Sequence, residues 1–316
     1  YGFGFSDYVD TDLASISATP RLNIAYRTGA MAHELKAGYD WYRTDYSSRR
    51  GQTPGAAPIH DIGIDAETSS PYLLQTSRWS DTSVSLGARQ SRVKQNSRDV
   101  YDATAPGAFD SQAAPDEQRF KEEMYEGGIS QALSPVLTAS IGASRSVRLG
   151  TVDETFEYDA LFNRVFSPLR PQIGHNVEGS LAFDQKGTRL TATVYRQKLR
   201  DEIQFNPILF TNDNLDPTLR SGINIGASTR VLENITVSGT LTEQRSKFRE
   251  GANKDNDVPL VPRRMGYLNV HWQATPLLSL ALSDTYTGDQ YFDNDQTNNF
   301  GQKIPAFHRV DTRVGF

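Results

Sequence analysis

Residues 137–147 read LTASIGASRSV. Leu137, Ala139, Ile141 and Ala143 are small or apolar, whereas the positions between them carry hydroxyl groups or a glycine. Side chains of a β-strand point alternately to its two faces, so this stretch has one apolar face and one polar face. An apolar face against lipid and a polar face toward a wet lumen is typical of a strand in a transmembrane β-barrel.

The same alternation recurs along the chain, and the links between the alternating segments differ in length. Short polar turns are predicted at 80–81, 133–135, 185–187, 232–234 and 274–276. Longer polar segments are predicted at 50–68, 94–116, 149–171, 250–261 and 289–303. Outer-membrane barrels have short periplasmic turns and longer extracellular loops. We therefore predict one all-β, antiparallel, up-and-down transmembrane barrel domain over residues 1–316, with about 14 strands in consecutive hairpins.

Two details follow from this interpretation. The short turns are expected at one rim and the long segments at the other. In residues 268–273 the apolar Leu268, Val270 and Trp272 are expected to face lipid, and the intervening Asn269, His271 and Gln273 the lumen. A slip of one residue would exchange the two faces.

The composition agrees with such a barrel. Hydrophobic residues make up 37% of the chain and the mean hydropathy is -0.54, which suits a barrel with a polar lumen and polar loops. No stretch approaches the roughly 20 consecutive apolar residues of a spanning helix. The chain has no Cys, which excludes disulfides and thiolate metal sites. A net charge of -5 suggests no nucleic-acid partner.

A soluble β-sandwich or propeller is the alternative, because its strands alternate too. The length of the alternating segments and the regular contrast between turns and loops favour the barrel. Residues 1–5 look like part of a strand, and residues 314–316 stop within the pattern. A closed barrel leaves no open edge in lipid, so further strands are expected beyond both ends.

Six segments carry a more specific signal when they are read in order. They are 33–40 (HELKAGYD), 146–154 (SVRLGTVDE), 169–179 with LRPQ and VEG, 194–203 (VYRQKLRDEI), 258–263 (VPLVPR) and 304–311 (IPAFHRVD). Together they resemble the barrel domain of TonB-dependent outer-membrane receptors. Gly150 replaces the family's usual Pro, Val147 its Phe and Gln172 its Glu. The resemblance covers nearly the whole chain.

The resemblance implies a barrel of about 22 strands around an N-terminal plug. Energised uptake of a scarce nutrient across the Gram-negative outer membrane is then expected, with a ferric siderophore or cobalamin as cargo. The implied partners are outer-membrane lipid, the metal chelate as cargo and the TonB energy-coupling complex, which would act through the plug. A monomer is expected. A passive diffusion porin is the alternative, and a plug sequence upstream would distinguish the receptor from it.

Aromatic and arginine side chains in the long segments are candidates for the cargo site. Aromatic faces pack against organic cargo, and guanidinium groups pair with its anionic groups. The candidates are Phe156, Tyr158, Phe162, Arg164, Arg249, Tyr291, Phe292 and Phe300. The alternative is that these side chains pack the loops against one another.

No catalytic or metal-binding motif is apparent. The five His residues form no pair with ligand spacing. Asp61, Asp65 and Glu67 share a predicted loop, but no compact calcium-binding sequence surrounds them, so solvated acids are the simpler interpretation. No nucleophile elbow, zinc-protease motif or phosphate loop occurs. We therefore predict neither an enzyme nor a cofactor.

Overall fold

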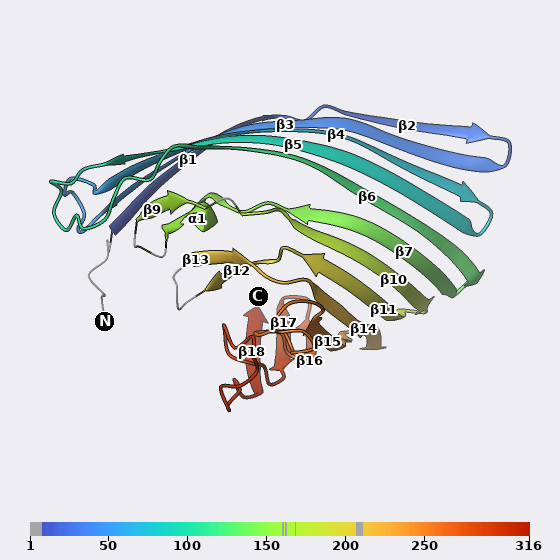
Figure 1. The fold of residues 1–316 in the computed structure, drawn as a ribbon. Coiled ribbons are helices and arrows are strands. Elements are labelled where there is room, and N and C mark those ends of the chain that lie inside the picture. The colour runs from blue at the N-terminus through green and yellow to red at the C-terminus, as the bar shows by residue number, and fades with distance from the viewer. Residues whose placement is uncertain (1–7, 160, 162, 168, 207–210) are drawn as a thin grey trace.

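The computed structural model describes residues 8–159, 161, 163–167, 169–206 and 211–316. A single sheet of 14 strands dominates it (Figure 1), and all of its pairings are antiparallel. The strands of this sheet follow one another in chain order. The predicted all-β, up-and-down arrangement is confirmed.

The first half of the sheet contains seven strands. They are β1 (Tyr8–Ala18), β2 (Arg21–Thr28), β3 (Met31–Gly51), β4 (His60–Trp79), β5 (Thr82–Tyr101), β6 (Asp116–Ser134) and β7 (Leu137–Arg148). Both β1 and β2 pair with β3, end to end, and Thr19–Pro20 separates them. Proline has no N–H to donate to a ladder, but at the edge of the sheet only one neighbouring strand is affected, so the interruption at Pro20 costs few hydrogen bonds.

The second half also contains seven strands. They are β10 (Gln172–Gln185), β11 (Thr188–Arg200), β14 (Thr218–Leu232), β15 (Ile235–Phe248), β16 (Arg264–Thr275), β17 (Leu278–Thr287) and β18 (Phe307–Gly315). The links contain α1 (Val152–Thr155) and two small hairpins, β8 (Phe156–Tyr158) with β9 (Arg164–Phe166), and β12 (Ile203–Asn206) with β13 (Thr211–Asn214). No helix among the described residues is long and apolar enough to cross a bilayer.

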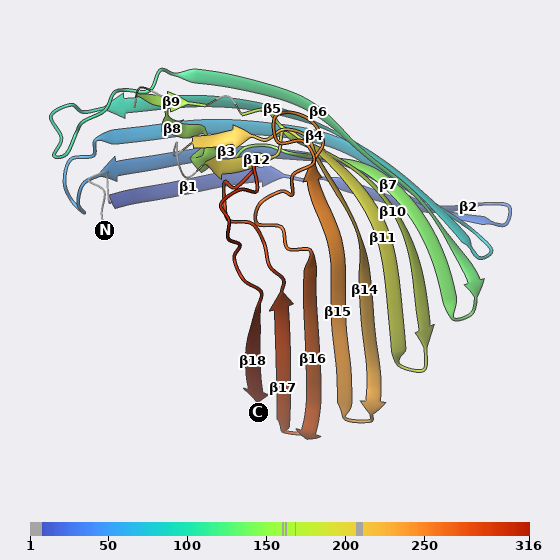
Figure 2. The same ribbon diagram turned by 60° about the horizontal axis from the view of Figure 1, so that its bottom comes forward.

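The short turns gather at one rim, as predicted, and Figure 2 shows β14 to β17 ending there together. Successive turns are joined by backbone hydrogen bonds, from Ala132 N to Asp81 O at 2.9 Å and from Gln273 N to Asn234 O at 2.8 Å. In the turn between β10 and β11, Lys186 and Gly187 both have positive φ, of 47° and 80°. Two such residues form the tight hairpin turn whose twist matches that of its strands.

The two faces of the sheet differ as the alternation predicts. Figure 1 shows α1, β9, β12 and β13 in the hollow of the curved sheet. The hollow, inner face carries polar pairs such as Ser70–Ser91 and Ser140–Ser180, whose hydroxyls lie 2.8 and 2.7 Å apart. The outer face presents exposed apolar side chains on neighbouring strands, among them Leu86, Ile129, Ile141, Val177, Val194 and Leu241.

Strand β16 has the predicted register. Val270 pairs with Val237 and Leu282, and Trp272 pairs with Ile235 and Leu280, so these side chains share the outer face. Asn269 lies between Ser238 and Ser283, on the inner face. Paired residues point to the same side of a sheet, which places Leu268 with the outer set and His271 with the inner set.

The strands of the first half are longer than predicted. β3 to β6 have 21, 20, 20 and 19 residues, whereas β16 and β17 have 12 and 10. The predicted loop at 50–68 is wrong from His60 onward, because β4 begins there, and the predicted loop at 94–116 begins only after Tyr101. Asp61, Asp65 and Glu67 therefore lie in β4 rather than in a loop. Residues 1–5, predicted to be part of a strand, lie outside the described residues.

The extra length of β3 to β6 lies beyond the point where β7 ends. Pairing of β6 with β7 stops at Tyr125 and Arg145, but β6 continues to pair with β5 as far as Asp116. Beyond the membrane, the apolar residues Ile62 and Ile64 of β4 lie on the inner face, because a loop segment rather than water covers that face there. The apolar face of the strand is therefore the inner one in this part and the outer one in the membrane, so the hydropathy pattern of the membrane-spanning part ends before the strand does. The projecting parts of β3 to β6 form a tall wall at the long-loop rim (Figure 1).

The two faces of β16 can be distinguished by a pair of substitutions. Val270→Arg places a charge on the outer face and is expected to lower the free energy of unfolding by about 2–4 kcal/mol near the bilayer midplane. His271→Arg, on the inner face of the same strand, should change it far less. Urea titration of the protein in phospholipid vesicles measures both values. Equal losses for the two variants would contradict the assigned faces.

Candidate functional site: the long-loop mouth of the barrel

Segment 149–171 forms a shelf against the inner face of the tall wall. Thr151 caps the short helix α1, and its N–H donates to the Glu154 carboxylate at 2.7 Å. The β8–β9 hairpin then places two phenylalanines on the wall, and their ring centroids lie 5.3 Å apart. The resulting buried cluster consists of Tyr46, Ile62, Ile64, Ala113, Phe156 and Phe166. The apolar inner residues of β3 and β4 thus hold a loop segment rather than line water.

A buried polar network fastens the same shelf. His60, at the start of β4, lies between two carboxylates, with Nδ1 3.0 Å from Asp99 and Nε2 3.0 Å from Asp110. Asp110 also accepts hydrogen bonds from Arg164 Nε at 3.0 Å and from the Tyr158 hydroxyl at 3.1 Å. The two ring nitrogens of His60 thus bridge the two carboxylates. The network joins the wall, the 102–115 loop and the shelf.

Aromatic rings complete the surroundings of Arg164. Its guanidinium carbon lies 3.6 Å from the ring centroid of Tyr158 and 4.9 Å from that of Phe156. Burial lowers the pKa of Arg164, and the nearby Tyr158 and Asp110 oppose that shift. Burial also raises the pKa of Tyr158, with the Arg164 charge acting in the opposite direction. Tyr158 therefore stays a neutral hydrogen-bond donor at physiological pH.

The β12–β13 hairpin links the shelf to the later loops. Glu157 on the shelf accepts hydrogen bonds from the backbone and side chain of Asn212. On the other side, Gln204 donates to Asp293 at 2.9 Å. Burial raises the pKa of Glu157, and the Asn212 hydrogen bonds oppose the shift. Side-chain contacts thus run from segment 149–171 across the hairpin to segment 289–303.

The last two long loops are joined to each other. Leu260 N donates to Tyr291 O at 3.1 Å, and Asp257 N donates to the Asn298 side chain at 2.7 Å. Within segment 289–303, Lys303 pairs with Asp289 at 2.9 Å and lies 4.4 Å from the Tyr291 ring centroid. The hydrogen bond and charge of Lys303 lower the pKa of Asp289. These contacts position one edge of the mouth.

The candidate residues fall into two groups. Phe156 and Arg164 are only 4% and 8% exposed and hold the shelf, as the loop-packing alternative predicts. Phe292 and Phe300 are 38% and 51% exposed. Tyr158 and Tyr291 are partly buried.

The two remaining candidates are Arg249 and Phe162. Arg249 follows the last residue of β15 and donates its N–H to Pro217 O at 2.7 Å. Phe162 lies outside the described residues. No sequence motif indicates the network of His60, Asp99 and Asp110, because its members are far apart in the chain and share no motif spacing.

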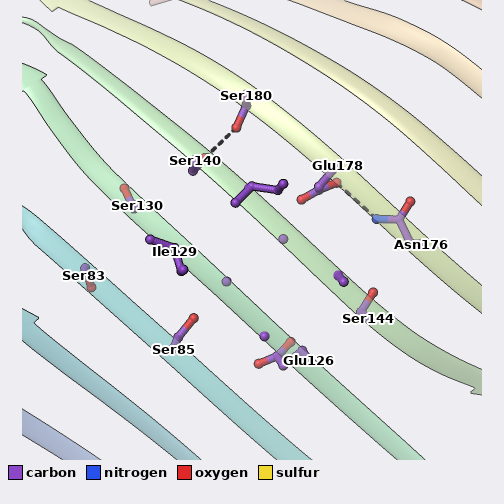
Figure 3. Close-up of a pocket in the computed structure, with 15 residues that line it drawn as sticks. Ser83, Ser85, Glu126, Ile129, Ser130, Ser140, Ser144, Asn176, Glu178 and Ser180 are labelled. Carbon is purple, nitrogen blue, oxygen red and sulfur yellow. Dashed lines mark hydrogen bonds between the residues drawn. The ribbon is translucent and has the colours of Figure 1, made fainter.

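Below the mouth, the inner wall carries a shallow trough of small polar residues (Figure 3). Ser83 and Ser85 on β5, and Ser130 on β6, line it beside hydroxyls of β7 and β10. Glu126 and Glu178 are the carboxylates of this trough, and Asn176 donates to Glu178 at 3.2 Å. Small side chains leave space along the wall. Within the described parts of the chain, no group of three or more His, Asp or Glu residues is arranged to hold a metal ion.

Comparison with known protein families identifies this architecture. The TonB dependent receptor-like β-barrel family matches residues 1–316, the whole chain. The chain belongs to this family. TonB-dependent receptors are outer-membrane proteins of Gram-negative bacteria, which confirms the expected outer-membrane location. Members of this family are transporters rather than enzymes, as expected for the family. No curated protein matches the sequence.

Solved structures of TonB-dependent receptors share the fold. The siderophore receptor PiuA from Acinetobacter baumannii has 16% identity and a TM-score of 0.75, and the match covers 97% of this chain and 50% of PiuA. The ferric citrate transporter FecA has 15% identity and a TM-score of 0.74 over 97% of this chain and 47% of its own. The ferric-catecholate receptor Fiu from E. coli K12 has 15% identity and a TM-score of 0.71, with 97% and 48% covered. The chain spans about half the length of these receptors.

The buried network predicts how firmly the receptor's shelf is held. Asp110→Asn removes the charge that Arg164 and His60 share, and breaking one side of a buried ion pair costs about 3–5 kcal/mol. We expect hydrogen–deuterium exchange to rise sharply across segment 149–171 and to stay unchanged in the turns of the opposite rim.

An exposed ion pair provides the control for this change. Glu117 and Arg119 pair at 2.7 Å but are 47% and 71% exposed, so Glu117→Gln should cost less than about 1 kcal/mol and leave exchange of the shelf unaltered. Unchanged exchange in Asp110→Asn would show that the apolar cluster alone holds the shelf.

Proposed function

We propose that this receptor captures a metal chelate at its long-loop mouth and that the whole protein imports it across the outer membrane. A ferric siderophore is the proposed cargo class. Family membership over the whole chain carries the proposal. PiuA, FecA and the ferric yersiniabactin receptor FyuA from Yersinia pestis, all similar in fold, are described as receptors or transporters of siderophores or ferric complexes. Cobalamin is the second candidate cargo.

The exposed and half-buried aromatic side chains of the mouth are the proposed cargo contacts. Phe292, Phe300 and Tyr291 lie on one segment, and Tyr158 lies on the shelf. Aromatic faces at a wet rim can pack against the organic part of a chelate. We assign Phe156 and Arg164 to support of this surface, because both are buried. Phe162 and Arg249 remain proposed contacts.

Support from the structure is geometric. The chain of contacts from Glu157 through Asn212 and from Gln204 to Asp293 connects the shelf with the segment that carries Phe292. Cargo bound to one loop therefore shifts the others through existing hydrogen bonds. No covalent chemistry or cofactor is needed for this step. Energy would come from the TonB complex acting on a plug, and a monomer suffices for the pathway.

A passive porin is the alternative function. It requires a lumen that stays open and uptake that is independent of the inner-membrane motor. Uptake of radiolabelled ferric chelate by cells with and without a functional TonB complex distinguishes the two functions. The receptor predicts loss of uptake without TonB, and the porin predicts no change.

Substitution of two adjacent aromatic residues, Phe292 and Tyr291, tests the proposed contacts. Removing a well-packed aromatic anchor costs more than about 1–2 kcal/mol of binding. Phe292→Ala and Tyr291→Ala are therefore expected to weaken cargo binding by roughly tenfold each. Affinity is measured on whole cells with a panel of ferric siderophores and cobalamin, after normalisation to receptor level.

Tyr26→Ala is the matched control. Tyr26 is an exposed tyrosine on β2, where it stacks on His33 at 4.6 Å near the short-turn rim. It should leave cargo affinity unchanged. Wild-type affinity in both Phe292→Ala and Tyr291→Ala would place the contacts elsewhere in the mouth, and selective binding of cobalamin would replace the siderophore as cargo.

A further inference from the structure

Three of the long links are bonded to one another at the mouth, and we call them together the acidic lip. The acidic lip comprises residues 201–217, 249–263 and 288–306. Arg249 N donates to Pro217 O at 2.7 Å, and Leu260 N donates to Tyr291 O at 3.1 Å, so each link is tied to the next. The exposed aromatic candidates of the mouth lie in the third link.

The acidic lip carries more negative charge than the chain as a whole. Its three links contain ten Asp and Glu residues against four Lys and Arg residues, a formal net charge of -6, whereas the whole chain has -5. Outside the lip, 29 cations nearly balance 28 acids. A hollow lined by charges of one sign concentrates ligands of the opposite sign. The lip is therefore expected to attract cations and to repel anions.

Ion pairs within the protein leave most of this negative charge uncompensated. Four lip acids form ion pairs, with Arg170, Arg220, Arg263 and Lys303. The other six form no ion pair with a described residue, and they are Asp213, Asp216, Glu250, Asp255, Asp293 and Asp295. Arg249 and Lys254, the remaining cations of the lip, are outnumbered three to one by these acids. Asp213, Asp216, Glu250 and Asp255 are also exposed.

One link of the lip already shows how an ammonium group is held there. Lys303 Nζ lies 4.4 Å from the centroid of the Tyr291 ring and 2.9 Å from a carboxylate oxygen of Asp289. An aromatic face attracts a cation through its quadrupole, and a carboxylate adds a charge-assisted hydrogen bond. Phe292 and Asp293 are the next aromatic and acidic residues of this link. No described cation lies over the Phe292 ring or pairs with Asp293.

The surroundings of Asp293 favour a group with several hydrogen-bond donors. Gln204 Nε2 donates to the Asp293 carboxylate at 2.9 Å, whereas the buried Gln204 Oε1 accepts no hydrogen bond from a described residue. A buried acceptor without a donor is unfavourable. An ammonium group has three N–H donors and no acceptor, so it suits these oxygen atoms and the exposed face of Phe292.

The trough below the mouth has the same sign as the lip. Glu126 and Glu178 face it from β6 and β10 (Figure 3), and none of the described residues that line it is Lys or Arg. A cargo with several negative charges would approach these carboxylates without a cation to compensate the repulsion. A neutral or cationic cargo meets no such barrier. Lip and trough thus favour the same charge of cargo.

We propose that the cargo is a ferric chelate with an ammonium group and no net negative charge, and that Phe292 and Asp293 receive this ammonium group. The inference rests on the proposed import of a ferric chelate and narrows its chemical class. The field of the acidic lip selects against chelates with several negative charges. Phe292 and Asp293 add a specific contact to that field.

A matched pair of chelates tests the charge directly. The probes are a linear ferric trihydroxamate with a terminal primary amine and the same chelate after N-acetylation, which removes the positive charge. A ferric tricatecholate with three negative charges is the third probe. Binding to the full-length receptor in neutral detergent is measured at low and at high salt. We expect the amine form to bind about tenfold more tightly than the acetylated form at low salt, and the tricatecholate to bind most weakly. High salt should reduce the preference to about threefold, because ions screen the lip.

Removal of lip charges should abolish this preference. Asp213→Asn, Glu250→Gln and Asp293→Asn are combined in one variant. The amine form should then bind within about twofold of the acetylated form, because the attraction between opposite charges is lost. Affinity for the acetylated form should stay unchanged, which checks that the mouth is folded.

The matched control removes three acids from the opposite rim. Asp81→Asn, Asp184→Asn and Glu233→Gln are combined, since these acids are exposed, lie in or beside the short turns and form no ion pair with a described residue. This variant should retain the wild-type preference for the amine form.

Three results would overturn the inference: equal affinity of the wild type for the amine and acetylated forms, tighter binding of the tricatecholate, or an equal loss of preference in the control. TonB-dependent uptake of the tricatecholate in preference to the amine form would also overturn it, while leaving import of a ferric chelate intact. Uptake of all three probes without a functional TonB complex would instead contradict the proposed import, and this inference with it.

Discussion

A backbone N–H or C=O group that faces lipid has no water to bond, so every such group of a spanning strand must find its hydrogen-bond partner within the sheet. The antiparallel ladder provides these partners by pairing each strand of the large sheet with the next strand of that sheet along the chain, from β3 through β18. Tight turns such as Lys186–Gly187 keep the register, and register decides which side chains meet lipid. Because side chains alternate between the two faces of a strand, every second residue is then an outer, apolar one and the residues between are inner and polar.

Beyond the membrane the constraint disappears, and other interactions take over. Water can bond the edges of β6, so the tall wall continues where β7 has already stopped. A buried cluster around Phe156 and the carboxylate of Asp110 then hold a loop segment against that wall. The receptor therefore combines a regular wall, determined by lipid, with an irregular mouth, determined by local packing and ion pairs. The proposed cargo contacts belong to the irregular part, and the lipid-facing side chains to the regular one.

The lipid-facing wall could be predicted from the sequence, whereas the packing of the mouth could not. Alternation in residues 137–147 and 268–273 was sufficient to predict strands, faces and the shared rim of turns, because lipid imposes a simple rule. The start of β4 at His60 was missed, because Ile62 and Ile64 are buried on the inner face under a loop segment, so the apolar positions have the opposite phase to the lipid-facing Leu73 of the same strand. The burial of Arg164 could not be predicted from the sequence either, because its partner Asp110 lies 54 positions away. Motif order identified the family, which no single spacing could have done.

Single-cysteine labelling along β15 tests whether successive side chains face lipid and lumen alternately, and the absence of Cys from this chain leaves each label as its only thiol. A fluorescent probe is placed in turn at residues 235–247 of the receptor in lipid vesicles and exposed to a lipid-soluble or a water-soluble quencher. Quenching by the lipid-soluble reagent should alternate, strong at 237 and 241 and weak at 238 and 240, and should end at Glu243. Quenching without a period of two, or with the opposite phase, would contradict the account.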